Sequence, residues 1–220
     1  MSFVEPTGRP ADTRLVLVRH GESVAQVEGF LSGHDTCRGL SDAGRAQAAA
    51  LRDRLVASGE LGGVDAVYTS ILPRTIETAA ILAPALGDAT PQSECDWCEI
   101  HAGEAEGLTW DEIRERYPLR GDPADPFRQR MPGAETWAEF FVRAGTRLRR
   151  VADEHAGERV VVVCHGGIIG ASFIALGDLP IKTALALTHE AINTSLTEWR
   201  WTGRHWRLVR YNDAAHVGVS

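Results

Sequence analysis

The sequence predicts an α/β fold, a three-layer sandwich in which a mainly parallel sheet is flanked by helices. Two short, continuous apolar runs, residues 15–18 and 160–163, are typical of strands that are buried on both faces. Segments with helical spacing of apolar residues alternate with such runs along the chain. This alternation favours parallel strands with helices on both sides of the sheet.

Length and composition indicate one domain, because a chain of 220 residues is long enough to bury a substantial core. We expect residues 1–13, which contain Pro6, Gly8 and Pro10, to be a flexible lead-in, and residues 14–220 to form the domain. The lead-in lacks the apolar stretch of a signal peptide, and no apolar run approaches the length of a membrane span. The sequence therefore predicts a cytoplasmic protein with no membrane partner.

Charge and cysteine content narrow the range of possible functions. The formal net charge is -7 and no long basic run is present, which argues against general nucleic-acid binding. Cys95 and Cys98 have the spacing of a redox motif, but no helical run follows them and no second pair completes a zinc site. Reduced thiols without a specific role are the favoured interpretation, and a redox or metal role is the alternative.

The first half of the chain supplies two predicted strands and three helices. A short helix over 22–27 and a glycine-rich loop over 29–39 follow the first strand. Ser41 is expected to cap a helix that ends near Gly59, and residues 64–68 form the second strand. Thr69 and Ser70 are expected to cap the next helix, with a proline in its first turn.

The second half begins with a short helix near 109–117 and an extended loop, 118–132, which contains four prolines. This loop is either a lid over the site or an inert connector. An amphipathic helix over 135–155, a buried strand over 159–164 and a helix over 168–176 follow. The alternating residues 195–211 predict a hairpin whose tryptophans, if exposed, are compatible with a homodimer contact.

Basic residues stand where three predicted strands end. Arg19 and His20 follow the first strand, Arg74 opens the helix after the second, and His165 follows the strand over 159–164. Arg19 and His20 alone read equally well as an ordinary strand end, and Arg74 alone favours a solvated helix arginine. The carboxyl ends of parallel strands, however, meet at one edge of a sheet. Four potential cations at one edge suit a phosphoryl group, and a histidine can also attack phosphorus.

Carboxylates are concentrated in residues 99–106, where Glu99, Glu104 and Glu106 surround His101. Such a cluster is usually a solvated loop. The functional alternative is that one carboxylate gives a proton to a departing substrate oxygen.

Together, five motifs resemble the histidine phosphatase superfamily, the phosphoglycerate mutase-like group. They occur in the family's order across residues 14–215 and are Leu-Val-Arg19-His20-Gly21-Glu22-Ser23, Thr69-Ser70 with Pro73–Thr78, Glu99–Gly103 with Glu106-Gly107, Gly133–Glu135, and Val-Cys-His165-Gly166-Gly167. The order of several motifs is far more specific than any one of them.

The resemblance implies a role for each catalytic residue type. His20 is then the nucleophile that becomes phosphohistidine, and Arg19, Arg74 and His165 bind the phosphoryl oxygens. Glu99 is expected to protonate the leaving oxygen and then to activate water. The resemblance implies no metal and no cofactor, because fixed cations do the work that magnesium does in kinases.

Substrate contacts are expected from Gln26, Ser32, Gly33 and Gly166. Gln26 stands where the family commonly has asparagine, and the loop over 32–39 departs from the usual family pattern. The substrate-binding loop is therefore where this chain differs most from its expected relatives.

The sequence predicts a phosphomonoesterase that acts on a small phosphorylated metabolite. A phosphoglycerate mutase is the first alternative, but Ile-His-Ala-Gly follows Glu99 in place of the arginine-histidine-tyrosine run typical of mutases. A non-catalytic phosphate-binding or scaffold protein on the same fold is the second alternative, and the five catalytic residue types argue against it.

Overall fold

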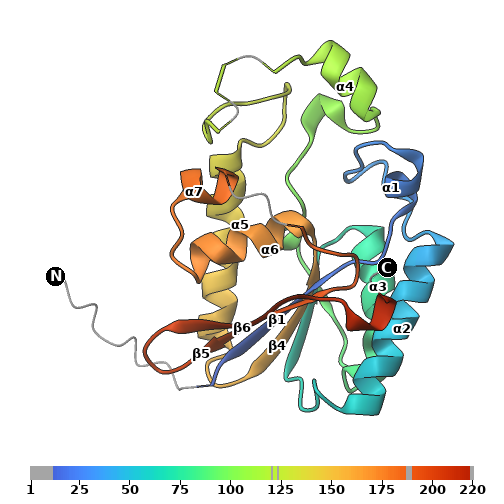
Figure 1. The fold of residues 1–220 in the computed structure, drawn as a ribbon, viewed down its shortest axis with the longest axis vertical. Helices are drawn as coiled ribbons and strands as arrows, with labels where there is room; N and C mark the ends of the chain where they lie inside the picture. Colours follow the sequence, from blue (N-terminus) through green and yellow to red (C-terminus); the bar gives the residue numbers. More distant parts are fainter. Residues whose placement is uncertain (1–11, 120, 123, 187–189, 219–220) are drawn as a thin grey trace.

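A computed structural model describes residues 12–119, 121–122, 124–186 and 190–218. Most of the expected lead-in, residues 1–11, lies outside the described residues. The described chain forms one six-stranded sheet in the order β3-β2-β4-β1-β5-β6 (Figure 1). The strands are β1 (Arg14–Arg19), β2 (Ala66–Thr69), β3 (Gln92–Ser93), β4 (Arg159–Cys164), β5 (Leu196–Trp201) and β6 (Trp206–Asp213).

Helices cover both faces of this sheet, which confirms the predicted sandwich. In Figure 1, α2 and α3 lie on one face and α5 and α6 on the other. The helices are α1 (Val24–Glu28), α2 (Asp42–Ser58), α3 (Pro73–Leu82), α4 (Trp110–Arg116), α5 (Trp137–Glu154), α6 (Gly166–Ala175) and α7 (Ile181–Ala186), with single turns η1 (Ala83–Ala85), η2 (Cys95–Trp97), η3 (Gly103–Ala105) and η4 (Ala215–Val217). No helix in the described ranges has both the length and the apolar character needed to cross a membrane.

The central strand β1 shows why its sequence is continuously apolar. Leu15 and Leu17 pack into the core beneath α5 and α6, and Val16 and Val18 pack into the core beneath α2 and α3. All four side chains are fully buried. A strand with helices on both faces has no polar side, so the alternation of a half-exposed strand is absent.

Strand direction brings the predicted site residues together. β1, β4, β2 and β3 run parallel, β5 runs antiparallel to β1, and β6 runs antiparallel to β5. Arg19 is paired with Cys164, and the His20 amide donates to the Cys164 carbonyl at 3.0 Å. The residues that follow the two strands, His20 and His165, therefore leave the sheet side by side, as the sequence predicts.

Several helix boundaries follow the local signals. Ser41 caps α2 as predicted, because its Oγ accepts a hydrogen bond from the Gly44 amide at 3.0 Å. Gly59 ends α2 in a left-handed conformation that glycine adopts without strain. Gly145 in α5 packs closely against α6, where the sequence pattern alone indicates only a helix.

The predicted cap of α3 is wrong. The N-cap residue is Leu72, which makes no side-chain capping bond. The Ser70 hydroxyl is engaged elsewhere, at 2.9 Å from Nε2 of His165 and 2.7 Å from Oγ1 of Thr75. The serine thus serves the site at the sheet edge and does not cap the helix.

The expectation of exposed tryptophans in the final hairpin is also wrong. Trp199 is buried and donates to the Ser172 hydroxyl at 2.9 Å. Trp201 and Trp206 are half-buried and pack against each other, with ring centroids 5.7 Å apart. Trp199 lies in the core beneath α5 and α6, Trp206 packs against that core, and β6 forms this edge of the sheet.

Candidate active site

His20 occupies the turn directly after β1 and is only 5% exposed. Its Nδ1 lies 2.7 Å from the carbonyl oxygen of Gly21. A carbonyl oxygen only accepts, so Nδ1 carries the proton and Nε2 keeps a free lone pair in the neutral ring. A Cβ at position 21 would overlap the backbone of Gly44 in α2, so the close approach that shapes this turn requires glycine.

His165 lies beside His20, with ring centroids 5.1 Å apart and an interplanar angle of 64°. Nε of Arg74 donates to Nδ1 of His165 at 3.3 Å, and Nε2 of His165 is 2.9 Å from Oγ of Ser70. Because the guanidinium can only donate, Nδ1 of His165 is the acceptor and Nε2 carries the proton. The two histidines thus hold opposite tautomers.

Both histidines are held in their neutral form. Burial lowers the pKa of His20 well below its ordinary value, and the charges of Arg74 and Arg19 lower it further. Burial likewise lowers the pKa of His165 well below the ordinary value, with Arg74 and His20 adding to the effect. Of the four potential cations that the sequence places at this edge, the two guanidiniums therefore stand beside two neutral imidazoles.

Arg74 is buried, Arg19 is half-buried, and hydrogen bonds hold both guanidiniums in place. Arg74 is buried at the start of α3, and its Nη1 lies 3.3 Å from Sγ of Cys37. Burial alone would raise the pKa of Cys37, but a backbone hydrogen bond from Gly39 and the Arg74 charge outweigh it and lower the pKa. Nη1 of Arg19 donates to the Ala191 carbonyl, and its buried Nε has no hydrogen-bond partner among the described residues.

Glu99 is the carboxylate of the predicted cluster that reaches this edge. Its Oε2 accepts from the Gly167 amide at 2.9 Å and its Oε1 from the Ile100 amide at 3.0 Å. A Cβ at position 167 would overlap Oε1, so glycine there leaves the room that Glu99 occupies. Charge attraction between Glu99 and Arg19 acts in the same pocket.

The other two carboxylates of the cluster have structural partners. Glu106 accepts from the amides of Asp35 and Thr36 at 2.7 and 2.9 Å and so holds the loop before α2. The exposed Glu104 accepts from the Tyr117 hydroxyl at 3.4 Å. Neither lines the cavity that contains Glu99.

The predicted substrate contacts are separated by the fold. Gln26, Ser32 and Gly166 line the cavity, whereas Gly33 packs against the Glu106 carboxylate. Oε1 of Gln26 accepts from the Ser23 amide at 3.0 Å within a capping box, and the side-chain amide also pairs with Asn193 at 3.2 Å. Gln26 thereby bridges the start of α1 and the segment before β5.

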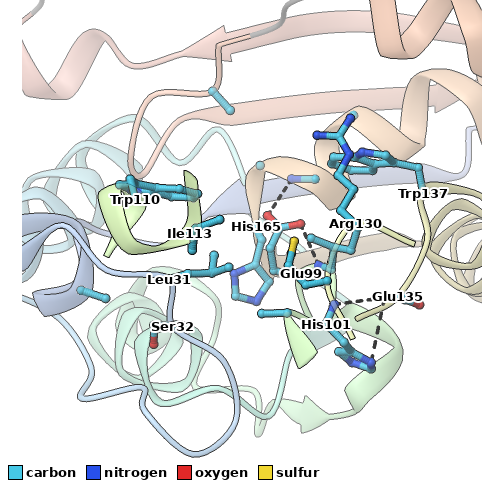
Figure 2. A pocket seen from close by; sticks show the side chains of 18 of the residues that line it. Leu31, Ser32, Glu99, His101, Trp110, Ile113, Arg130, Glu135, Trp137 and His165 are labelled. Carbon is cyan, nitrogen blue, oxygen red and sulfur yellow. Dashed lines mark hydrogen bonds and ion pairs between the residues drawn. The ribbon is translucent and has the colours of Figure 1, made fainter. Parts of the chain in front are cut away.

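These side chains open into a cavity of about 1060 Å³. The floor is formed by Arg19, His20, Arg74, Glu99 and His165. Its walls are largely apolar and include Leu31, Trp110, Ile113 and Trp137 (Figure 2).

The extended loop over 118–132 forms part of this wall through Arg128, Arg130 and Met131, so it is not an inert connector; residues 120 and 123 lie outside the described residues. Sequence reasoning missed the contribution of α4. The alternation of polar and apolar residues in that helix does not reveal which neighbour it faces.

The buried neutral histidines predict a pH dependence of stability. Histidines in the unfolded chain have an ordinary pKa of about 6.5, and burial holds the pKa of both His20 and His165 in the folded chain below that value. As the pH falls below about 6.5, the unfolded chain therefore binds more protons than the folded chain. Stability is complete above about pH 6.5 and falls below it by about 1.4 kcal/mol per pH unit for each histidine. Urea unfolding of the wild type, His20→Asn and the exposed control His205→Asn measures this. If the slope of the unfolding free energy against pH is the same in His20→Asn as in the wild type, the neutral state assigned to His20 is wrong.

Comparison with known proteins agrees with the motifs. The family model of the histidine phosphatase superfamily (branch 1) matches residues 15–214. Phosphoglycerate mutase-like protein 4 of Arabidopsis thaliana is 31% identical over 207 residues, which cover 92% of this chain and 86% of that protein. The metal-independent phosphoserine phosphatase of the same plant is 28% identical over 208 residues, 93% of this chain and 83% of that protein.

A solved structure shares the whole architecture. The mycobacterial glucosyl-3-phosphoglycerate phosphatase in complex with VO3 has a TM-score of 0.75 and 28% identity, and the match covers 91% of this chain and 99% of that chain. The chain therefore belongs to the histidine phosphatase superfamily, as its motifs predict, and it is a histidine phosphatase that hydrolyses phosphate monoesters.

Proposed function

We propose that this phosphatase works in two steps through a phosphohistidine on Nε2 of His20. The observation that carries the proposal is the state of His20, a buried neutral imidazole whose proton is held on Nδ1 by the Gly21 carbonyl. A neutral ring nitrogen with a free lone pair is the nucleophilic form of histidine.

In the first step Nε2 of His20 attacks phosphorus, and the bond from phosphorus to the ester oxygen breaks. Glu99, in its protonated form, gives its proton to that oxygen, so the product leaves as an alcohol. In the second step the Glu99 carboxylate takes a proton from water, the water oxygen binds phosphorus, and the P–N bond breaks. Inorganic phosphate leaves and His20 regains its neutral ring.

Arg19, Arg74 and His165 are proposed to bind the phosphoryl oxygens. The two guanidiniums supply fixed positive charge in a water-poor site, where it stabilises the charge that develops on the phosphoryl group. The buried Nε of Arg19 is a donor that an anion would satisfy. His165 holds its donor on Nε2 and is oriented by Ser70 and Arg74.

The substrate is proposed to be a small phosphorylated metabolite whose remainder contacts the walls of the cavity. The relatives named phosphoserine phosphatase and glucosyl-3-phosphoglycerate phosphatase act on compounds of that class. Arg128 and Arg130 lie on the wall and favour a second anionic group on the substrate. Gln26, Ser32 and Gly166 are proposed to contact the substrate, and Gly33 to shape the loop that carries Ser32.

Three further proposals concern the organisation of the protein: one domain over 14–220, a cytoplasmic location and a homodimer.

The edge strand β6 is the proposed dimer contact, because it exposes Leu208, Val209 and Tyr211. Sedimentation equilibrium tests the homodimer: we expect a dimer for the wild type and a monomer for Val209→Asp. A wild-type monomer at high protein concentration would rule the dimer out.

Replacing the nucleophile should abolish activity without a need for metal. We expect the purified protein to release phosphate from an aryl phosphate in EDTA, and His20→Ala to release none. The same assay over sugar phosphates, phosphoglycerates and phosphoserine identifies the substrate class. Activity that survives in His20→Ala, or that requires a divalent metal, would contradict the mechanism, and interconversion of phosphoglycerates without phosphate release would favour a mutase.

The role of Glu99 predicts a dependence on the leaving group. Glu99→Gln should lower kcat/KM, which reports the first step alone, about a hundredfold or more for alkyl phosphates, whose leaving oxygen needs a proton, and far less for an acidic aryl phosphate. Gly167→Ala should give the same pattern, because the new Cβ displaces the Glu99 carboxylate.

The matched control is Gly145→Ala, whose Cβ would meet Ala175 only at an ordinary contact of 3.5 Å, and we expect it to keep wild-type kinetics. Equal losses of kcat/KM on alkyl and aryl substrates in Glu99→Gln would show that Glu99 is not the proton donor.

A further inference from the structure

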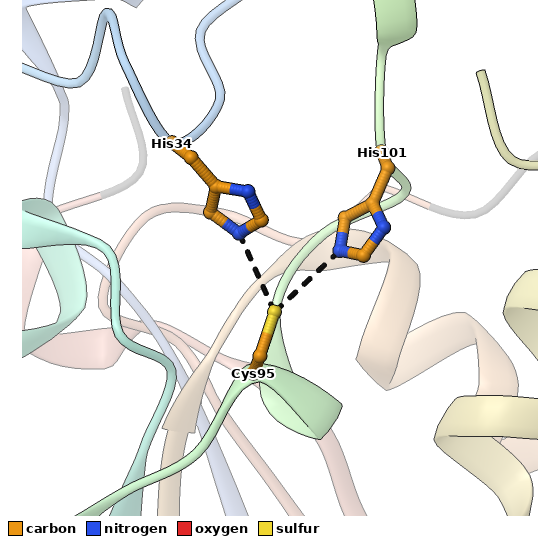
Figure 3. Close-up of side chains that lie close together, drawn as sticks. All are labelled: His34, Cys95 and His101. Atoms are coloured by element: carbon orange, nitrogen blue, oxygen red, sulfur yellow. Dashed lines mark hydrogen bonds between the residues drawn. The ribbon is translucent and has the colours of Figure 1, made fainter. Parts of the chain in front are cut away.

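Three side chains with metal-binding atoms converge beside the active site. Nε2 of His34 lies 3.4 Å from Sγ of Cys95, and Nε2 of His101 lies 3.6 Å from the same sulfur (Figure 3). All three ligand atoms lie within 4.8 Å of one another. His34 comes from the loop between α1 and α2, Cys95 from η2, and His101 from the segment after Glu99.

The two separations between the sulfur and the histidine nitrogens match those around a tetrahedral zinc ion. With Zn–S of about 2.3 Å and Zn–N of about 2.0–2.1 Å at tetrahedral angles, the sulfur and each nitrogen stand about 3.5 Å apart. One thiolate and two imidazoles are ligands that zinc prefers, whereas magnesium and calcium prefer oxygen. The printed sequence hides this set, because its members are dispersed over 68 positions, from His34 to His101.

We propose that His34, Cys95 and His101 form a zinc site with one coordination position left for water. On binding, the Cys95 thiol loses its proton to solvent, and a Zn–S bond and two Zn–N bonds form. The site takes no part in phosphoryl transfer. The proposal does not depend on the mechanism assigned to His20.

Other contacts hold two of the ligands in place. Glu135 accepts hydrogen bonds from Nε and Nη2 of Arg143 at 2.9 and 2.8 Å. Glu135 also accepts from the His101 amide at 3.2 Å and lies 3.9 Å from Nδ1 of the His101 ring (Figure 2). Nη1 of Arg143 also donates to the Cys95 carbonyl at 3.2 Å. Glu135 therefore holds the His101 backbone through the amide and lies behind the ring at a distance too long for a direct hydrogen bond.

His34, the third ligand, lies on a loop that hydrogen bonds also hold in place. Glu106 binds the amides of Asp35 and Thr36, the two residues that follow His34. Leu31 and Ser32, which precede His34, line the active-site cavity. An occupied site would therefore tie this wall of the cavity to the segment 95–101 that carries Glu99, and we expect bound zinc to raise the thermal unfolding temperature.

Cobalt provides a spectroscopic probe of this geometry. Reduced protein stripped of metal with EDTA and then freed of the chelator is titrated with Co²⁺ without oxygen. We expect one equivalent to bind, with the d–d bands of tetrahedral cobalt and a thiolate-to-cobalt charge-transfer band, and one equivalent of Zn²⁺ to remove both. Cys95→Ser should lose the charge-transfer band, and His34→Asn and His101→Asn should each weaken binding more than about tenfold.

The exposed His205→Asn is the matched control and should bind like the wild type. Phosphate release from an aryl phosphate in EDTA shows that His34→Asn and Cys95→Ser are folded, since neither residue belongs to the phosphate site. The proposal is overturned if the wild type gives no stoichiometric cobalt spectrum, or if folded Cys95→Ser keeps the charge-transfer band.

Discussion

Parallel pairing of β1 with β4 is the constraint on which the site depends. The register sets Arg19 opposite Cys164, so His20 and His165 emerge together at one edge of the sheet. β2 pairs with the other side of β4, and the turn after β2 starts α3 with Arg74 in reach of His165. The apolar runs that bury these strands therefore also position the polar groups, and a shift of register by one residue would separate the histidines.

Burial gives these groups their chemical character. In water a histidine is partly protonated near neutral pH, but burial next to two guanidiniums holds both rings neutral. The same burial strengthens the attraction between the guanidiniums and an incoming anion. In the proposed mechanism one arrangement thus supplies the nucleophile and the phosphate-binding site, and it also predicts a loss of stability in acid.

Local sequence signals predicted every strand except β3, most helices and the residues at the floor of the cavity, because apolar runs and the residues that follow them are contiguous in the chain. They could not predict what depends on distant partners. The tautomer of His165 depends on Arg74, whose Nε donates to its Nδ1. The choice of Glu99 over Glu106 requires knowing which carboxylate is already bound to a loop. The gathering of His34 with Cys95 and His101 has no local signal at all.

The most direct test of the central claim is to identify the phosphorylated atom during turnover. The enzyme is mixed with a slowly hydrolysed substrate, quenched in alkaline denaturant that preserves phosphohistidine, digested, and sequenced by mass spectrometry. The account predicts one phosphoryl group, bound to His20 through Nε2, that forms and decays at rates compatible with turnover. A phosphoryl group on His165, or turnover with no phosphorylated residue under conditions that preserve a phosphohistidine standard, would contradict it.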